Sequence, residues 1–98
     1  MIKLLRSEEF DRWLRKLRDE RAVARVQARL LRLSLGNAGY AKPVGEGVSE
    51  MRIDYGPGYR IYFKRRGEEL ILLLIGGDKQ TQDADINLAK AIAASWKD

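Results

Sequence analysis

Basic and phenolic side chains in the second half of the chain are the residues with the most apparent chemistry. Arg60, Tyr62 and Lys64 alternate with other residues, so they share one face of an expected β-strand. Arg52 lies on the preceding expected strand and faces the same side, and Lys79 follows the end of the next strand. Because the planar fork of a guanidinium group matches a phosphate bidentately, this set predicts a phosphate-binding site on a rigid sheet.

Charged residues on strands often pair with one another instead, and this alternative applies to part of the set. Arg52 could pair with Glu50 or Glu69 across the sheet. For Arg52 and Lys64 both interpretations stay open. For Arg60, which lies in the most aromatic strand, the functional interpretation is favoured.

Several other kinds of site are excluded by composition. The chain has no His and no Cys, so it contains no Ser-His-Asp triad, no cysteine nucleophile and no usual zinc site. The glycine-rich turns at residues 56–58 and 76–77 do not match nucleotide-binding loops, which need a helix directly after them. A metal site formed by Asp78, Asp83 and Asp85 is a weak alternative, because a helix cap explains Asp83 equally well. We therefore expect no metal and no cofactor.

Two amphipathic helices are expected in the first third of the chain, after a short strand near Ile2 and Leu4. Ser7 is the expected N-cap of the first helix. The apolar stripes have helical spacing and comprise Phe10, Trp13, Leu14 and Leu17, then Val23, Val26, Leu30 and Leu33. The second helix should end at Gly36-Asn37. Because the connection between them is short, the two helices should form an antiparallel hairpin.

The positive charge of the chain is concentrated in this helical region. Residues 1–35 hold ten Lys or Arg and five Asp or Glu, a net charge of +5. This equals the net charge of all 98 residues. Five arginines avoid the apolar stripe of the second helix and should form a basic outer ridge: Arg18, Arg21, Arg25, Arg29 and Arg32. Such a ridge favours an anionic partner, nucleic acid above all, although a solvated helix face explains it as well.

The remainder of the chain predicts strands and one further helix. After a loop at residues 36–47, strands are expected at 48–55, 59–64 and 70–75, and a final helix is capped by Thr81 or Asp83. The predicted order is β-α-α-β-β-β-α in a single α+β domain of residues 1–98, with the helical hairpin on a mainly antiparallel twisted sheet. The opposite face, with the arginines, should stay partly open. The longest apolar run, 70–75, is too short to cross a bilayer, so we expect a soluble cytoplasmic protein.

Several blocks of sequence together resemble a known family. The segment "SEMRIDYGPGYRIYF", an apolar strand, "GGDKQTQ" and a short helix resemble the RelE/ParE superfamily of toxins from type II toxin–antitoxin systems. The N-terminal "SEEFDRWLRKLRD" and the loop "AKPVGEGVSE" extend the resemblance over nearly the whole chain. It is most similar to the HigB-like branch, also called addiction module killer proteins. The resemblance implies a RelE-like fold.

The resemblance also implies a function and a set of site residues. Many members are ribosome-dependent endoribonucleases, or mRNA interferases, in which the RNA 2′-OH attacks the scissile phosphate and translation and growth stop. Arg60 matches the arginine of the family's "GYR" strand, and Lys79 and Arg52 match basic residues near it. Lys79 or Tyr62 would transfer protons. The sequence departs from relatives that use His, and Asp85 or a neighbour replaces a tyrosine of RelE-type enzymes, which leaves the general acid and base open.

The implied partners are an antitoxin, usually a helix-turn-helix protein, and the ribosome with its mRNA. Operator DNA would be contacted only through the antitoxin, and no membrane is involved. Lys64 and the arginine ridge would bind ribosomal RNA, or the ridge would hold the antitoxin. Two alternatives stay open: a ParE-like inhibitor of DNA gyrase without catalytic activity, and an inert antitoxin-binding module. The combination of Arg52, Arg60 and Lys79 argues against the gyrase inhibitor.

Overall fold

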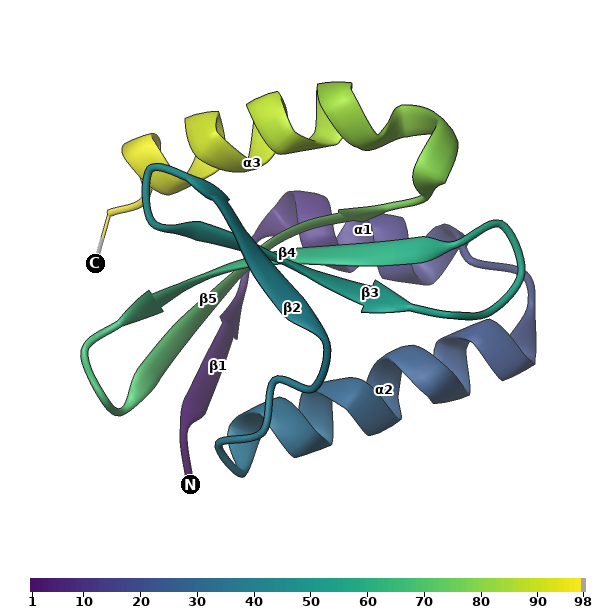
Figure 1. Ribbon diagram of the computed structural model, residues 1–98, viewed down its shortest axis with the longest axis horizontal. Helices are drawn as coiled ribbons and strands as arrows, with labels where there is room; N and C mark the ends of the chain where they lie inside the picture. Colours follow the sequence, from purple (N-terminus) through teal and green to yellow (C-terminus); the bar gives the residue numbers. More distant parts are fainter. Residues whose placement is uncertain (98) are drawn as a thin grey trace.

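The computed structural model describes residues 1–97, which form an α+β fold with a five-stranded mixed sheet (Figure 1). The elements in chain order are β1 (Lys3–Arg6), α1 (Glu8–Lys16), α2 (Glu20–Ser34), β2 (Ala41–Gly45), β3 (Val48–Ile53), β4 (Tyr59–Arg66), β5 (Leu70–Gly77), the 3₁₀ helix η1 (Lys79–Thr81) and α3 (Gln82–Ser95). No helix in this described range is long and apolar enough to cross a membrane.

The sheet has the strand order β1-β5-β4-β3-β2, in which β1 is parallel to β5 and every other pair is antiparallel. The expected class and the mainly antiparallel sheet are confirmed. The prediction of a loop throughout residues 36–47 is wrong, because β2 pairs with β3 there. Pro43 and Gly45 made this segment look unlike a strand, but proline is tolerated on an edge strand, where a missing N–H leaves no ladder bond broken.

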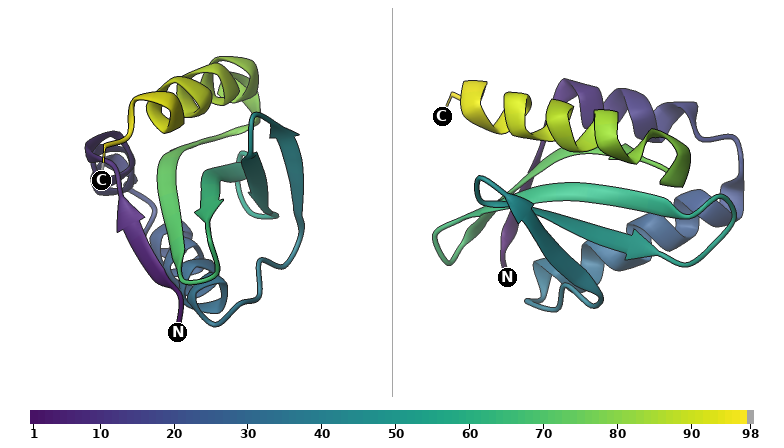
Figure 2. Two further views of the ribbon diagram at one scale, coloured as in Figure 1. Left: turned by 90° about the vertical axis from the view of Figure 1, so that its left-hand side faces the viewer. Right: turned by 45° about the horizontal axis from the view of Figure 1, so that its top comes forward.

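Helices cover both faces of the sheet, since α2 and α3 lie on opposite sides of it (Figures 1 and 2). One apolar cluster joins Phe10, Val26 and Leu30 to the α2 side of the sheet. The other joins Ala89 and Ile92 of α3 to the opposite side. The arginine-bearing face is therefore open only in part: α3 packs on it, whereas Arg52 and Lys64 stay half-buried.

The two N-terminal helices begin and end as expected but do not form the expected hairpin. Ser7 caps α1 by accepting a hydrogen bond from the amide of Phe10 at 2.8 Å, and its hydroxyl donates to the carbonyl of Leu74 at 2.6 Å. α1 packs on β5, and α2 diverges from it beyond their short connection (Figure 1). Each apolar stripe packs on the sheet, and a Cβ on Gly76 would overlap the ring of Trp13, so α1 approaches β5 closely.

A bulge in β5 shifts its register against β4 near the end of the strand. Tyr62 pairs with Ile75 but Phe63 pairs with Leu73, so Leu74 is the extra residue. Beyond the bulge, Gly77 pairs with Arg60. Gly77 also allows α3 to start close by, because a Cβ there would overlap the Asp85 carboxylate. Gly77 thereby lets the first turn of α3 lie beside the end of β5 that pairs with Arg60.

Candidate functional site

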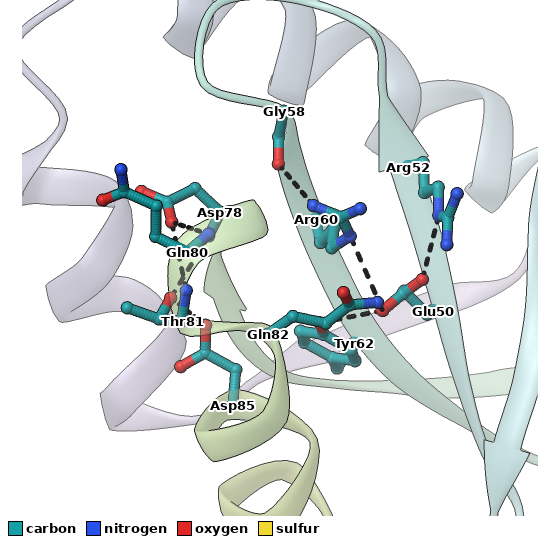
Figure 3. A network of polar contacts seen from close by, with 10 residues as sticks. All are labelled: Glu50, Arg52, Gly58, Arg60, Tyr62, Asp78, Gln80, Thr81, Gln82 and Asp85. Atoms are coloured by element: carbon teal, nitrogen blue, oxygen red, sulfur yellow. Dashed lines mark hydrogen bonds and ion pairs between the residues drawn. The ribbon is translucent and has the colours of Figure 1, made fainter.

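The carboxylate of Glu50, on β3, is the centre of the polar network on the arginine face (Figure 3). Its side chain is fully buried. The Arg52 Nε donates to Oε1 at 3.1 Å, and the Tyr62 hydroxyl and Gln82 Nε2 donate to Oε2 at 2.9 and 2.8 Å. The Arg60 Nε forms an ion pair with Oε2 at 3.7 Å. Strands β3 and β4 and the first residue of α3 therefore meet at one carboxylate.

Strand register explains why an acid is needed at this point. Arg52 and Arg60 are directly opposite one another on β3 and β4, and like charges in that arrangement destabilise a sheet. Glu50 shares their face, lies opposite Tyr62 and contacts both guanidinium groups. Burial raises the pKa of Glu50, but the hydrogen bonds from Gln82, Arg52 and Tyr62 outweigh it, so the pKa lies below its ordinary value. The carboxylate is therefore ionised at neutral pH and offsets one of the two charges.

Arg60 is held in place from two sides, with only 7% of its surface exposed. Its Nη1 donates to the carbonyl of Gly58 at 3.0 Å, and its Nε, which has no hydrogen-bond partner, faces Glu50. Arg52 is more exposed and pairs with Glu50 through Nε, so the pairing interpretation of Arg52 is confirmed. That contact occupies one of the five N–H donors of Arg52 and leaves the terminal nitrogens for another acceptor.

A pocket of about 400 Å³ opens near the end of β3 and the start of β4, where these arginines lie. Its cationic lining consists of Arg29 from α2, Arg52 from β3 and Arg60 from β4. Arg29 donates from Nη1 to the carbonyl of Arg52 at 2.6 Å and from Nη2 to that of Ala38 at 3.1 Å. Burial, and to a lesser extent the neighbouring Arg32, lower the pKa of Arg29 below its ordinary value. Three fixed guanidinium groups thus make this pocket suited to an anion.

The base of the Lys79 side chain lies near Arg60. The Lys79 Cβ and the Arg60 Nη1 each lie 3.6 Å from the position that a Cβ on Gly58 would take. Gly58 has a φ of +80°, so the turn between β3 and β4 needs glycine there for its backbone conformation. Lys79 is exposed and is the first residue of η1. The Asp78 carboxylate fixes the backbone of η1 by accepting hydrogen bonds from the amides of Gln80 and Thr81.

Tyr62 is too deeply buried for the expected role in proton transfer. Its ring is fully buried, and its hydroxyl donates to Glu50. Burial, the hydrogen bond to Glu50 and the nearby negative charges raise the pKa of Tyr62 well above its ordinary value of 10. The phenol therefore stays protonated and cannot reach a ligand directly, which favours a role in holding Glu50.

The residues expected to bind RNA outside this cluster are dispersed. Lys64 pairs with Val48 at the far end of β4, close to Gly47, and does not line the pocket. Arg29 points inward and is not part of the expected outer ridge. The other four ridge residues are exposed, with one of them in the connection between α1 and α2: Arg18, Arg21, Arg25 and Arg32. Arg25 stacks at 4.5 Å over the ring of Tyr55, whose hydroxyl donates to Asp19.

Most of the residues that organise the site were not predicted from the sequence. Glu50 appeared only as a possible partner of Arg52, although its position on the same strand face could have shown that it reaches Arg60 as well. Gln82 and Arg29 left no local signal, since their partners are 32 and 23 residues away. The alternative acidic metal site receives no support: no group of His, Cys, Asp or Glu within residues 1–97 could hold a metal ion. Asp85 instead accepts a hydrogen bond from the Thr81 hydroxyl at 2.6 Å.

Comparison with known proteins gives one family relationship. No protein-family model matches the chain. It is 52% identical over 84 residues to an uncharacterized protein of Haemophilus influenzae, a match that covers 86% of this chain and 85% of the relative. The chain belongs to the same family as that protein. This membership is established by sequence identity, whereas the function has to be argued from the site.

Proposed function

We propose that the protein is the toxin of a type II toxin–antitoxin module, a cytoplasmic, ribosome-dependent endoribonuclease with a RelE-like fold in the HigB-like branch of the RelE/ParE superfamily. One observation carries the proposal. Arg52 and Arg60, fixed by a shared buried carboxylate, line one pocket beside Lys79. The sequence resemblance supplies the reaction class, and the geometry of these residues supports it.

Phosphoryl chemistry on RNA needs what this arrangement offers. Charge grows on the oxygens of the scissile phosphate in the transition state, and donors that are already in place stabilise it without reorganising. Arg60 is held by Gly58 and Glu50, and Arg52 by Glu50, so neither guanidinium group has to be ordered when the substrate binds. Glu50 is buried beneath them and offsets one charge, which leaves the pocket cationic.

The reaction needs no protein nucleophile, because the RNA supplies it. The 2′-oxygen forms a bond to phosphorus while the bond from phosphorus to the 5′-oxygen breaks, which leaves a 2′,3′-cyclic phosphate and a 5′-hydroxyl. The 2′-hydroxyl loses its proton to water, and the leaving 5′-oxygen gains one. Lys79, exposed beside Arg60, is the residue that we assign to the leaving oxygen. A lysine ammonium group is a weak proton donor at neutral pH, so cleavage of free RNA should be slow.

The ribosome and an antitoxin complete the proposal. The ribosome would hold the mRNA with its 2′-oxygen in line, which can replace much of the missing acid–base catalysis. The exposed arginines Arg18, Arg21, Arg25 and Arg32, together with Lys64, would bind ribosomal RNA through phosphate contacts that weaken with salt. The antitoxin would be a helix-turn-helix protein that also carries the pair to operator DNA.

The test is an in vitro translation reaction with purified protein and one defined mRNA, in which new 5′ ends are mapped by primer extension. We expect cleavage only when ribosomes are present. Arg60→Ala should reduce the cleavage rate about 10²–10³-fold, the usual effect of losing one preorganised donor. Arg15→Ala, which removes an exposed arginine of the last turn of α1, is the matched control and should leave the rate unchanged.

A second variant separates loss of chemistry from loss of folding. Arg60→Ala leaves Glu50 without one partner, so its folding is checked by circular dichroism. Arg60→Lys keeps the charge beside Glu50 but cannot bind a phosphate bidentately, so we expect it to fold and still to cleave slowly. Intact mRNA and normal protein synthesis with the unaltered protein would refute the nuclease proposal. A gyrase supercoiling assay would then test the ParE-like alternative.

A further inference from the structure

Two tyrosines share the cationic pocket with the arginines and have no part in the mechanism above. Tyr40, just before β2, and Tyr59, at the start of β4, both line the pocket. The Tyr40 side chain is conspicuous because 65% of this large aromatic residue is exposed. Its backbone is nevertheless fixed, since its carbonyl accepts a hydrogen bond from the amide of Arg52 at 3.2 Å. The ring is therefore accessible and extends from a fixed backbone.

The aromatic and cationic groups are close enough to hold one ligand. The Arg52 guanidinium carbon lies 5.9 Å from the centre of the Tyr40 ring. Tyr59 is half-buried, with its ring edge against Trp13 at 6.3 Å between ring centres, so it forms a fixed wall. The pocket volume of about 400 Å³ falls within the range of small-molecule sites. Asp54 also lines the pocket and is the one carboxylate in that lining.

We propose that this pocket is a nucleotide subsite, in which a nucleobase stacks on Tyr40 while its phosphate is bound by Arg52 and Arg60. The inference deepens the proposed function, on which it rests for the identity of the substrate as RNA. Phosphate binding alone would need the arginines but not an exposed aromatic ring beside them. Every base has a π face, so stacking on a tyrosine is tolerant of sequence.

An acidic peptide fits this pocket less well than a nucleotide. Its carboxylates would satisfy the guanidinium groups, but it would gain little from the flat face of Tyr40. The two ligands are distinguishable because only the nucleotide should depend on the ring. Hexaglutamate therefore serves as a competing probe in the experiment.

The experiment is an NMR titration of the ¹⁵N-labelled full chain, without ribosomes, with adenosine 5′-monophosphate and with ribose 5-phosphate. The two probes carry the same phosphate and differ in the base. We expect the nucleotide to bind at least about 5-fold more tightly, because stacking of one base on an aromatic ring is worth that much or more. The amide signals that shift should include those of residues that line the pocket.

Two variants of Tyr40 make the test specific. Tyr40→Ala should bring the ratio of the two affinities to about one, and Tyr40→Phe, which keeps the ring, should preserve it. Both should melt at the temperature of the unaltered protein, since the side chain is largely exposed. Hexaglutamate should bind more weakly than the nucleotide, and its affinity should be the same for Tyr40→Ala as for the unaltered protein.

The possible results separate this inference from the proposed function. Equal affinities for the two probes, or no binding of either, would overturn the subsite, whatever the translation assay shows. Hexaglutamate that binds more tightly than the nucleotide would overturn it in favour of a protein ligand. Base-dependent binding that is lost in Tyr40→Ala, together with intact mRNA in the translation assay, would support the subsite while the nuclease function fails.

Discussion

Four side chains contact the buried carboxylate of Glu50, so we expect its replacement to lower the free energy of unfolding strongly. We compare two replacements, Glu50→Ala and Glu50→Gln. The first removes the acceptor and the charge together. The second keeps one oxygen of similar position but removes the charge beside Arg60 and Arg52.

The contacts set the expected magnitudes. Breaking a buried ion pair by removing one partner costs about 3–5 kcal/mol, because the other charge stays buried without compensation, and Arg60 is 7% exposed. Removal of the acceptor of the Tyr62 hydroxyl adds a desolvation cost of about 1–3 kcal/mol, although the two costs are not additive. Glu50→Ala should therefore lose about 4 kcal/mol or more, a large part of the 5–15 kcal/mol that is usual for a domain. Glu50→Gln should lose about 3 kcal/mol, since it also leaves the Arg60 charge without a counter-charge but keeps one acceptor oxygen for hydrogen bonds.

Urea unfolding followed by circular dichroism measures both values. The matched control is Glu46→Gln, which breaks an ion pair with Lys90 of similar length, 3.7 Å, in which the Glu46 side chain is 70% exposed. A surface pair of this kind is worth about 0–1 kcal/mol. If Glu50→Gln costs no more than Glu46→Gln, Glu50 does not hold the two arginines, and the preorganisation argued for the site is wrong.

Two further predictions concern pH and packing. The pKa of Glu50 is lower in the folded chain than the ordinary 4.5. The carboxylate therefore contributes to stability above pH 4.5, and this contribution is lost as the pH falls through the folded-state pKa. The urea midpoint of the unaltered protein should drop in acid, and that of Glu50→Gln should drop less. If both proteins show the same acid dependence, other groups cause it. Gly76→Ala should destabilise the chain by about 1–3 kcal/mol, because its methyl group would overlap the Trp13 ring, and Trp13→Phe should recover part of the loss in the double variant. An unchanged melting temperature for Gly76→Ala would contradict the close approach of α1 to β5.

The strands that carry the site were predictable because their signals are local. Alternation placed Arg52 and Arg60 on one face, and the turn through Gly58 made their strands neighbours. β2 was not predictable by the same means, since Pro43 and Gly45 disfavour a strand and only pairing with β3 makes one. The divergence of α2 from α1 was also missed, because short connections favour a hairpin but each helix gains more from packing on the sheet.

The site itself was predictable in part for a related reason. Side chains that project from one hairpin can be placed from the period of two residues in a strand. The position of α3 cannot be predicted in this way. It is the packing of α3 that buries Tyr62 and brings Gln82 to Glu50. The bulge at Leu74 is equally hidden in an unbroken apolar run, although it shifts the register between β4 and β5.

The hydrogen bonds on the main chain of Arg52 have a consequence for solubility. Where the pairing of β3 with β2 ends, the N–H and carbonyl of Arg52 would otherwise be free to pair with a strand of another molecule. Unpaired strand edges of this kind lead to aggregation. The carbonyl of Tyr40 accepts the Arg52 amide, and the Arg29 guanidinium occupies the Arg52 carbonyl. Pro43 removes a donor from the outermost strand itself. The same guanidinium group that lines the anion pocket therefore also closes this stretch of sheet edge to a second chain.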